Sequence, residues 1–559
     1  MDRRDFLSLK KNNAIVVPNV EEGLRGINSG LNPYTGPWTN KEISHLLKRT
    51  MFGSAKADMD YFRTMSPSQA IDILLTVPAS LPPPPLKDYN NDDIDPTDAD
   101  ITVAQGTTWV NTITKDGTAN AKRVASLKSW WTGLMLNQDR SLLEKMTLFW
   151  HNHFSTEVNI YGAATFGYKH ISLLRQNALG NFKQLVRAVT VDPAMLLYLN
   201  GNLNTAGAPD ENYARELQEL FTVGKENNPN YTESDVITAA RVLTGWDVDG
   251  TTETVVFKIN RHDKNSKQFS SFYNNTAIAG RTDATAGDVE LDDLLNMIFG
   301  KSVEVSEFIV RKFYRWLCYY TIDADTETNV IKPLALQLRN ANWEIKTVLS
   351  ALLKSEHFFD PLNQGCLIKS PIENLVGTCR EFAVVFPNGT DYIAQYNMWD
   401  RIRELASLLQ QNLLDPPSVS GWSAYYQVPQ FYEMWINADT LPKRNLFTDA
   451  MITSGFTQGG KTIVIDAVAF TKSLPNPSDP NLLINDALDI LYRVPISDQS
   501  KQTIKQQILL TNQTQDYYWT NAWNAHIGNP SDATAYDVVN NRLKNLYKYF
   551  MNLAEYQLA

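Results

Sequence analysis

Apolar residues recur at the spacing of an α-helix, about 3.6 residues, along most of this 559-residue chain, and this period limits the possible folds more than any other feature. The pattern dominates from residue 123 to about residue 362, with irregular interruptions at 200–210 and 253–285. Inside the second interruption, the β-branched run 254–259 predicts a short strand. We therefore expect a mainly α fold: a large multi-helix orthogonal bundle with a few short β-strands and long irregular loops.

Composition suggests three parts along the chain. Residues 1–37 are expected to form an irregular arm, because glycines and prolines are spaced through them. Residues 38–450 are expected to form the main helical domain, in which the proline- and aspartate-rich stretch 78–100 predicts a stiff surface loop. Residues 451–559 are less regular and end in a long helix that is expected to begin near residue 531.

Charge and cysteine content exclude several classes of protein. The formal net charge is −10 and the pI is about 5.3, so we expect no general affinity for nucleic acid. The three cysteines, Cys318, Cys366 and Cys379, have no paired spacing, which excludes a disulfide framework and a thiolate zinc site. The 13 Trp, 24 Tyr and 23 Phe fit a carbohydrate-binding surface or a large helical core, and the core is the simpler interpretation.

The N-terminus gives conflicting evidence about the compartment. Residues 3–7, Arg-Arg-Asp-Phe-Leu, match the core of a twin-arginine export signal. Residues 8–13 are polar, however, and the apolar run 14–17 is too short for the hydrophobic region of a signal peptide. The sequence also has no apolar span of the length that crosses a membrane. A periplasmic or cell-envelope location and a cytoplasmic location both stay open.

The first candidate for a functional site is the segment FWHNHFST at 149–156. Ser141 and Glu144 have capping-box spacing, which predicts that a helix starts there. His151 and His153 would point roughly 160° apart around a continuous helix, so they can share a metal only if the helix unwinds after Trp150. The alternatives are a metal or acid–base pair at a helix end, or a buried, hydrogen-bonded His153 with His151 at the surface.

The second candidate is the helix predicted after Asp210. Glu216 lies at the border of its apolar face, where a carboxylate must find a partner or take up a proton. This makes Glu216 the best single candidate for a metal ligand or general base, with a structural ion pair as the alternative. Arg215 belongs to an i,i+4 ladder with Glu211 and Glu219 on the other side of the helix.

The third candidate is the loop 261–267, RHDKNSK, directly after the predicted strand. His262 and Asp263 are typical of sites that are placed on loops, although both are also common turn residues. The sequence contains no GxSxG elbow, P-loop, GxGxxG fingerprint or HExxH motif.

Together these segments resemble the bacterial domain-of-unknown-function family 1800. The resemblance runs from about residue 38 to the end of the sequence, and its motifs are HLLKRTMFG (45–53), FWHNHFST (149–156), AMLLYLN (194–200), ENYARELQELFTVG (211–224), YTESDVITAARVLTGW (231–246), RHD..SK (261–267), KSP (369–371) and PPSVSGW (416–422). It implies a mostly helical fold, with the family signature on His151, His153, Glu211, Asn212, Arg215, Glu216, His262 and Asp263. It also implies a sulfatase-like partner protein of unknown function, and export for many members.

Two hypotheses about function follow, and the sequence favours the first. In the first hypothesis, the chain is a binding or assembly component of a bacterial envelope or export-linked complex. The polar motifs would then be buried networks, and the aromatic residues would anchor interfaces. In the alternative it is a metal-assisted hydrolase with a divalent metal ion as cofactor. The metal would then be held by His151, His153, Glu216 and His262, and catalysis would rest on Glu216, Arg215, His262 and Asp263.

Overall fold

The computed structural model describes residues 29–225 and 231–559, and the fold is mainly α, as predicted. The twin-arginine start and most of the predicted N-terminal arm lie outside the described residues. Within the described residues, the strands form three separate two-stranded antiparallel sheets. None of the helices in these two ranges is long and apolar enough to cross a membrane.

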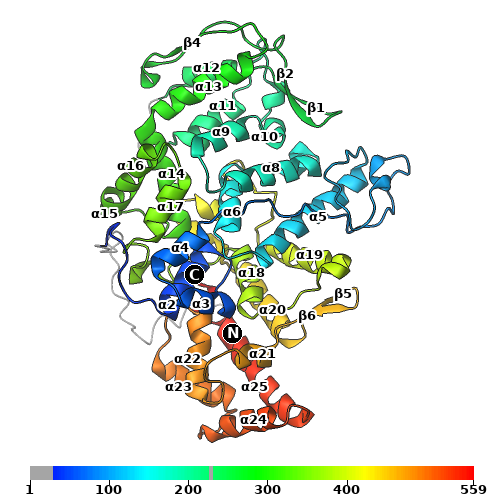
Figure 1. Ribbon diagram of the computed structural model, residues 1–559, viewed down its shortest axis with the longest axis vertical. Helices are drawn as coiled ribbons and strands as arrows, with labels where there is room; N and C mark the ends of the chain where they lie inside the picture. Colours follow the sequence, from blue (N-terminus) through cyan, green and yellow to red (C-terminus); the bar gives the residue numbers. More distant parts are fainter. Residues whose placement is uncertain (1–28, 226–230) are drawn as a thin grey trace.

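The first half of the chain supplies the middle and the upper part of the molecule in Figure 1. The helices are α2 (Asn40–Thr50), α3 (Lys56–Arg63), α4 (Pro67–Leu74), α5 (Gly117–Leu136), α6 (Leu143–His153), α7 (Val158–Tyr161), α8 (Ala164–Asn177), α9 (Phe182–Thr190), α10 (Pro193–Tyr198), α11 (Asn212–Glu216) and α12 (Glu233–Val242). A π-helical turn, Leu217–Thr222, continues α11. The hairpins that follow are β1 (Trp246–Asp249) with β2 (Thr254–Phe257), and β3 (Lys267–Gln268) with β4 (Ala277–Ile278).

The second half returns through the middle and ends at the bottom of Figure 1. Its helices are α13 (Ala286–Gly300), α14 (Ser302–Leu317), α15 (Ala324–Thr326), α16 (Lys332–Asn340), α17 (Ile345–Leu353), α18 (Pro371–Glu381), α19 (Tyr392–Leu408), α20 (Thr440–Thr453), α21 (Ala467–Lys472), α22 (Pro480–Leu491), α23 (Asp498–Ile504), α24 (Tyr517–Gly528) and α25 (Ala533–Asn552). The third hairpin is β5 (Phe456–Gln458) with β6 (Lys461–Ile463).

Local signals in the sequence locate several element boundaries. The predicted run 254–259 contains β2, which ends at Phe257. The long last helix, α25, begins after Asp532, whose carboxylate accepts hydrogen bonds from the Thr534 and Ala535 N–H groups. Such caps depend on residues within one turn of the helix, which is why the sequence alone predicts them.

The capping box predicted for Ser141 and Glu144 is wrong. Ser141 Oγ does accept a hydrogen bond from the Leu143 N–H at 3.2 Å. The Glu144 carboxylate, however, accepts two hydrogen bonds from Arg175 of α8. A bidentate, charge-assisted pair is stronger than one bond to a backbone N–H, so α6 begins at Leu143 with no side-chain cap.

The stretch 78–100 is a long loop, but part of it is buried. Lys87 and Asp100 have no exposed surface, and Lys87 Nζ lies 2.7 Å from Asp100 Oδ2. Arg123 of α5 lies 2.6 Å from the other carboxylate oxygen of Asp100. These charges attach the loop to the body of the protein, while Val77 and Leu81 near its start stay exposed.

Residues 451–559 pack against helices from earlier in the chain. Within this region α25 contacts α21, and it also contacts α20, while α22 contacts α2. The Lys369 N–H donates to Gln557 O at 2.8 Å, and the Ala559 N–H donates to Leu367 O at 2.8 Å. The division between 38–450 and 451–559 stays a prediction.

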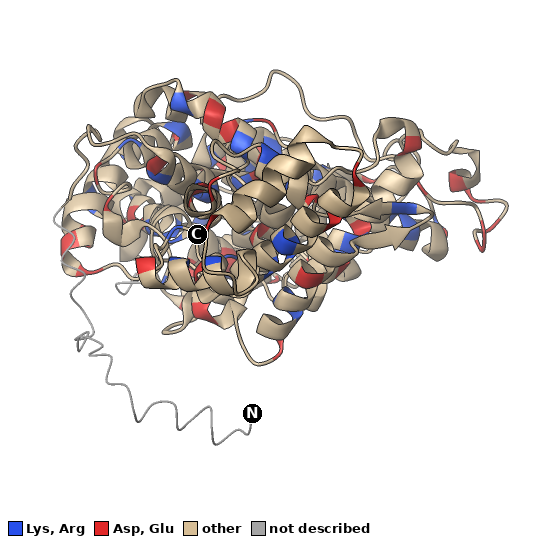
Figure 2. Cartoon of the chain, turned by 90° about the horizontal axis from the view of Figure 1, so that it is seen from below, with Lys and Arg blue, Asp and Glu red and all other residues tan. Residues whose placement is uncertain are grey.

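Helix α6 lies near the middle of Figure 1, and all of its residues except Asn152 are buried. Trp150 is fully buried, and its Nε1–H donates to Ala178 O at 2.9 Å. The rings of Phe182 and Phe313 both lie 5.7 Å from the Trp150 ring. In Figure 2, Lys and Arg are interspersed with Asp and Glu over the helices in view.

Candidate functional site

Five polar side chains of α6 point away from the helix in different directions. Each one binds a different segment of the chain, so α6 connects parts of the protein that are far apart in sequence. The pairs are Glu144 with Arg175, Lys145 with Glu373, His151 with the Leu414 N–H, Asn152 with the Trp422 N–H, and His153 with Phe221 O.

His151 is fully buried, so the alternative that placed it at the surface is wrong. Its Nε2 accepts a hydrogen bond from the Leu414 N–H at 3.2 Å, so the proton of the neutral ring is on Nδ1. Nδ1 has no hydrogen-bond partner among the described residues. Burial, followed by the charges of His170 and Lys128, lowers the pKa of His151 well below its usual value. The ring is therefore a neutral imidazole.

His153 is 4% exposed, in agreement with the alternative of a buried, hydrogen-bonded histidine. Its Nε2–H donates to Phe221 O at 3.1 Å, and its ring stacks parallel to Phe149 with centroids 6.0 Å apart. Burial, followed by the charge of Lys312, lowers the pKa of His153 well below its usual value. Because α6 runs unbroken to His153, the unwinding that a shared metal would require does not occur.

Arg215 and Glu216 lie at the end of α11, just before the π-helical turn. Arg215 pairs with Glu211 at 3.0 Å and with Glu233 of α12 at 2.9 Å. Glu216 is half-buried, and its Oε2 has no hydrogen-bond partner in the described part of the chain. Burial, followed by the nearby charge of Glu219, raises the pKa of Glu216 to about 6. Of the two outcomes expected for a carboxylate at this border, a partner or a proton, the raised pKa agrees with the second, and the role of Glu216 as a ligand or general base stays a prediction.

His262 and Asp263 belong to a closed network behind β2. His262 Nδ1–H donates to Thr244 O at 2.8 Å, and its Nε2 lies 3.2 Å from Glu290 Oε1. Glu290, which is on α13 and fully buried, also accepts a hydrogen bond from Lys267 Nζ at 2.5 Å. Burial alone would raise the pKa of Glu290, but hydrogen bonds from His262 and Lys267 lower it overall.

Asp263 faces another partner. Its Oδ2 accepts a hydrogen bond from Arg241 of α12 at 2.7 Å, and its Oδ1 accepts one from the Asn265 N–H at 2.9 Å. Burial would raise the pKa of Asp263, but these hydrogen bonds lower it overall. Both motif residues therefore fix the loop 261–267 against α12 and α13.

The four predicted metal ligands, His151, His153, Glu216 and His262, do not come together, because each is surrounded by different neighbours, as given above. Within residues 29–225 and 231–559, no group of three or more His, Cys, Asp or Glu side chains is placed to hold a metal ion. The structure therefore does not contain the single shared centre that the sequence suggested. The part that each residue has in binding or catalysis stays a prediction.

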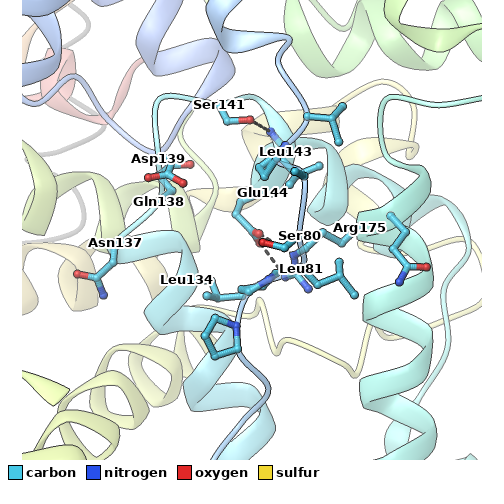
Figure 3. Close-up of a pocket in the computed structure, with 16 residues that line it drawn as sticks. Ser80, Leu81, Leu134, Asn137, Gln138, Asp139, Ser141, Leu143, Glu144 and Arg175 are labelled. Carbon is cyan, nitrogen blue, oxygen red and sulfur yellow. Dashed lines mark hydrogen bonds and ion pairs between the residues drawn. The ribbon is translucent and has the colours of Figure 1, made fainter. Parts of the chain in front are cut away.

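A cavity of about 540 Å³ opens beside the start of α6. Its walls are the proline-rich segment 77–83, the end of α5 and part of α8, and Figure 3 shows Glu144 and Arg175 side by side with Ser80 and Leu81 close to them. Arg175 donates Nε–H and Nη2–H to Glu144 at 2.7 and 2.9 Å. The cavity has the volume of a small-molecule site, and its walls combine apolar residues with polar ones, among them Asp139 and the Glu144–Arg175 ion pair.

A comparison with protein-family models matches residues 45–558 to the family described as "Protein of unknown function (DUF1800)". The chain belongs to the DUF1800 family. A comparison of the chain with curated proteins and one with solved structures found no match. The family assignment predicted from the motifs is confirmed.

Some polar pairs of this DUF1800 protein were not predicted from its sequence. His170 Nδ1–H donates to Asp192 at 3.0 Å, and the same carboxylate caps α10 through the Met195 N–H. The Asp192-Pro193 pair is a recognisable helix start in the sequence. The sequence does not show that Asp192 also binds His170, because His170 is on another helix, α8. Glu290 is another such residue, since nothing near it in sequence indicates that it lies against His262.

We predict that the buried network of this DUF1800 protein depends on the charge of Glu290. Glu290→Gln leaves Lys267 buried without a carboxylate, so we expect the free energy of unfolding to fall by about 3–5 kcal/mol. The matched control is Asp293→Asn on the same helix, because Asp293 forms a partly exposed ion pair with Arg281 at 3.1 Å. That control is expected to change stability by no more than about 1 kcal/mol in urea unfolding. Equal, small effects of the two variants would contradict the network.

We also predict that Glu216 makes stability depend on pH. Its pKa is raised from 4.5 to about 6 in the folded chain, so between these values the folded state binds more protons than the unfolded state. Stability from this group therefore falls as the pH rises from 4.5 through 6. Glu216→Gln should remove this fall and be more stable than the wild type above pH 7, by at most about 1 kcal/mol because solvent reaches the carboxylate. Urea unfolding at pH 5 and 7.5 measures this, and a less stable variant at pH 7.5 would contradict it.

Proposed function

We propose that this DUF1800 protein is a binding or assembly component of a bacterial envelope or export-linked complex. The observation that carries the proposal is the pairing of the motif residues with the protein's own groups. His153 donates to a backbone carbonyl, Arg215 pairs with two glutamates, and His262 lies between Thr244 and Glu290. A general acid or base must reach a proton of its substrate, whereas these side chains hold helices and loops together.

The cavity beside α6 supports a binding role. Its volume of about 540 Å³ suits a small ligand or a short segment of a partner. The exposed apolar side chains of Val77 and Leu81 lie at its rim, and the Glu144–Arg175 pair contributes polar groups without net charge. Together with Asp139, these groups favour a ligand that has both apolar and polar parts.

The hairpin of α24 and α25 supports an assembly role. At the bottom of Figure 1, this hairpin carries exposed aromatic and aliphatic side chains, of which Tyr517 is 52% and Tyr549 40% exposed. Tyr518 and Val538 on the same two helices are also exposed. Tyrosine is enriched at protein interfaces because it has a large apolar body and a polar end. We propose that this surface contacts the sulfatase-like partner implied by the family resemblance.

Co-expression with a sulfatase-like protein of the kind that the family resemblance implies tests the proposal. We expect the two proteins to co-elute at a fixed ratio in size-exclusion chromatography with light scattering. Tyr517→Ser combined with Tyr549→Ser should weaken the complex by at least about 10-fold, as expected for aromatic anchors. The control is Val385→Ser, at an 82% exposed residue between α18 and α19, which should leave the affinity unchanged.

Two results would contradict the proposal. One is that the wild-type chain forms no complex with this partner. The other is hydrolysis of a model ester, phosphoester or glycan by zinc-supplemented protein at a rate that Glu216→Gln abolishes. The second result would support the metal-assisted hydrolase instead.

A further inference from the structure

Two cavities share a wall at the end of α5. The first is the cavity of about 540 Å³ beside α6, and the second, of about 550 Å³, lies between α3, the end of α18 and the loop 383–389. Asn137 and Gln138 line both cavities. Figure 3 shows these two side chains on the side of the first cavity away from Arg175. The two cavities are therefore neighbouring parts of one surface, with Gln138 between them.

The polar side chains along this surface have more free donors than free acceptors. Gln138 Nε2 and Oε1 have no hydrogen-bond partner among the described residues, and the same is true of Arg175 Nη1 in the first cavity and Arg380 Nε in the second. Three of these four atoms donate, and Gln138 Oε1 accepts. The Gln138 amide breaks no hydrogen bond of the described chain when it turns toward a ligand. A run of peptide groups, each with a C=O and an N–H, matches this set.

The apolar part of the surface is mainly aliphatic. The first cavity is lined by Val77, Leu81, Leu134 and Leu143 together with three prolines, and none of the described residues in its lining is aromatic. In the second cavity the one aromatic residue among the described lining residues is Phe386. A sugar ring stacks on the flat apolar face of an aromatic side chain, which the first cavity does not offer. Aliphatic side chains of a peptide fit this lining better than a sugar does.

Asp139 gives the first cavity a negative charge. Glu144 and Arg175, the other charged residues that line it, neutralise each other as an ion pair. Asp139 is exposed and forms no ion pair with a residue that the structure describes. In the second cavity, Asp58 pairs with Arg380 at 2.9 Å. A basic side chain of a ligand is therefore attracted to Asp139, with the modest energy of an exposed pair.

We propose that the two cavities bind one extended peptide segment of a partner that carries an aliphatic and a basic side chain. The aliphatic side chain lies between Leu81 and Leu134, and the basic one faces Asp139. The Gln138 amide donates to a C=O and accepts from an N–H of the peptide, which then continues toward Phe386. This proposal rests on the binding role proposed above and names the class of ligand for its cavity.

A phage-displayed library of random dodecapeptides tests the proposal on the full chain. The library is first depleted on Ser80→Trp, which puts a large ring close to Glu144 and Arg175, and is then panned on the wild type. Ser80 is exposed, so the larger side chain is compatible with the fold. We expect the enriched peptides to share an aliphatic residue near a Lys or Arg. The absence of any peptide enriched on the wild type over Ser80→Trp would overturn the proposal.

Two variants then locate the binding of an enriched peptide, measured by fluorescence anisotropy. Gln138→Ala removes both hydrogen bonds of the amide and should weaken binding by about 10-fold. Asp139→Asn should weaken binding by about 3-fold, and it should have no effect on a peptide whose basic residue is replaced by Gln. The control is Gln499→Ala, at an exposed residue of α23 that lines neither cavity, which should leave the affinity unchanged. Unchanged affinity in Gln138→Ala would place the peptide elsewhere and contradict the proposal.

The peptide site and the complex proposed above fail separately. Tyr517→Ser combined with Tyr549→Ser should bind the peptide as tightly as the wild type, because α24 and α25 line neither cavity. Peptide binding without a complex would contradict only the proposed partner, and a complex without an enriched peptide would contradict only the peptide site. Binding of an oligosaccharide from a glycan array that Gln138→Ala weakens would assign the cavities to a sugar and overturn the peptide.

Discussion

Buried charge is the constraint on which the arrangement of this protein depends. A charged side chain that leaves water must meet an opposite charge or a set of hydrogen bonds, and here the partners come from segments far apart in sequence. Lys48 of α2 meets Glu381 of α18, Lys145 of α6 meets Glu373 of α18, and Lys267 meets Glu290 of α13. Each pair fixes the place of two helices or loops. Removing one partner leaves the other charge buried, so these contacts make the packing specific even where their net contribution to stability is small.

This constraint also explains why the family motifs contain so many polar residues. FWHNHFST begins on the buried helix α6, and its two histidines and its asparagine bind three segments that are far away in sequence. The loop 261–267 is held by Arg241, which belongs to the motif 231–246, and by Glu290, which no motif contains. The exposed features used in the proposal, by contrast, are a cavity with a mixed apolar and polar lining and a tyrosine-bearing hairpin. This division between internal polar pairs and external apolar surfaces is the physical basis of the binding role proposed above.

The sequence predicted the features that depend on residues nearby in the chain, such as helix periodicity and caps. Its predictions failed where residues far away in the chain determine the partner or the burial of a side chain. The mainly α fold and the start of α25 follow from periodicity and from the Asp532 cap. The capping box at Ser141 failed because Arg175, more than thirty residues later, binds Glu144. One of the two alternatives put His151 at the surface because one helix viewed alone has an outer face, whereas in the fold the rings of Trp131 and Trp422 cover that face. The raised pKa of Glu216 agrees with one of the two outcomes that its position predicted, because the border of an apolar face is visible in the sequence of the helix itself.

The central claim is that the imidazoles of His151 and His153, in the motif on α6, are neutral internal braces. The most direct measurement is a long-range ¹H–¹⁵N NMR spectrum of the ¹⁵N-histidine-labelled protein between pH 5 and 8, with and without Zn²⁺. We expect His151 to stay neutral with its proton on Nδ1, and His153 to stay neutral with its proton on Nε2, at every pH and with zinc present. Titration of either ring near pH 6.5, or a shift of its nitrogen signals on addition of zinc, would contradict the account.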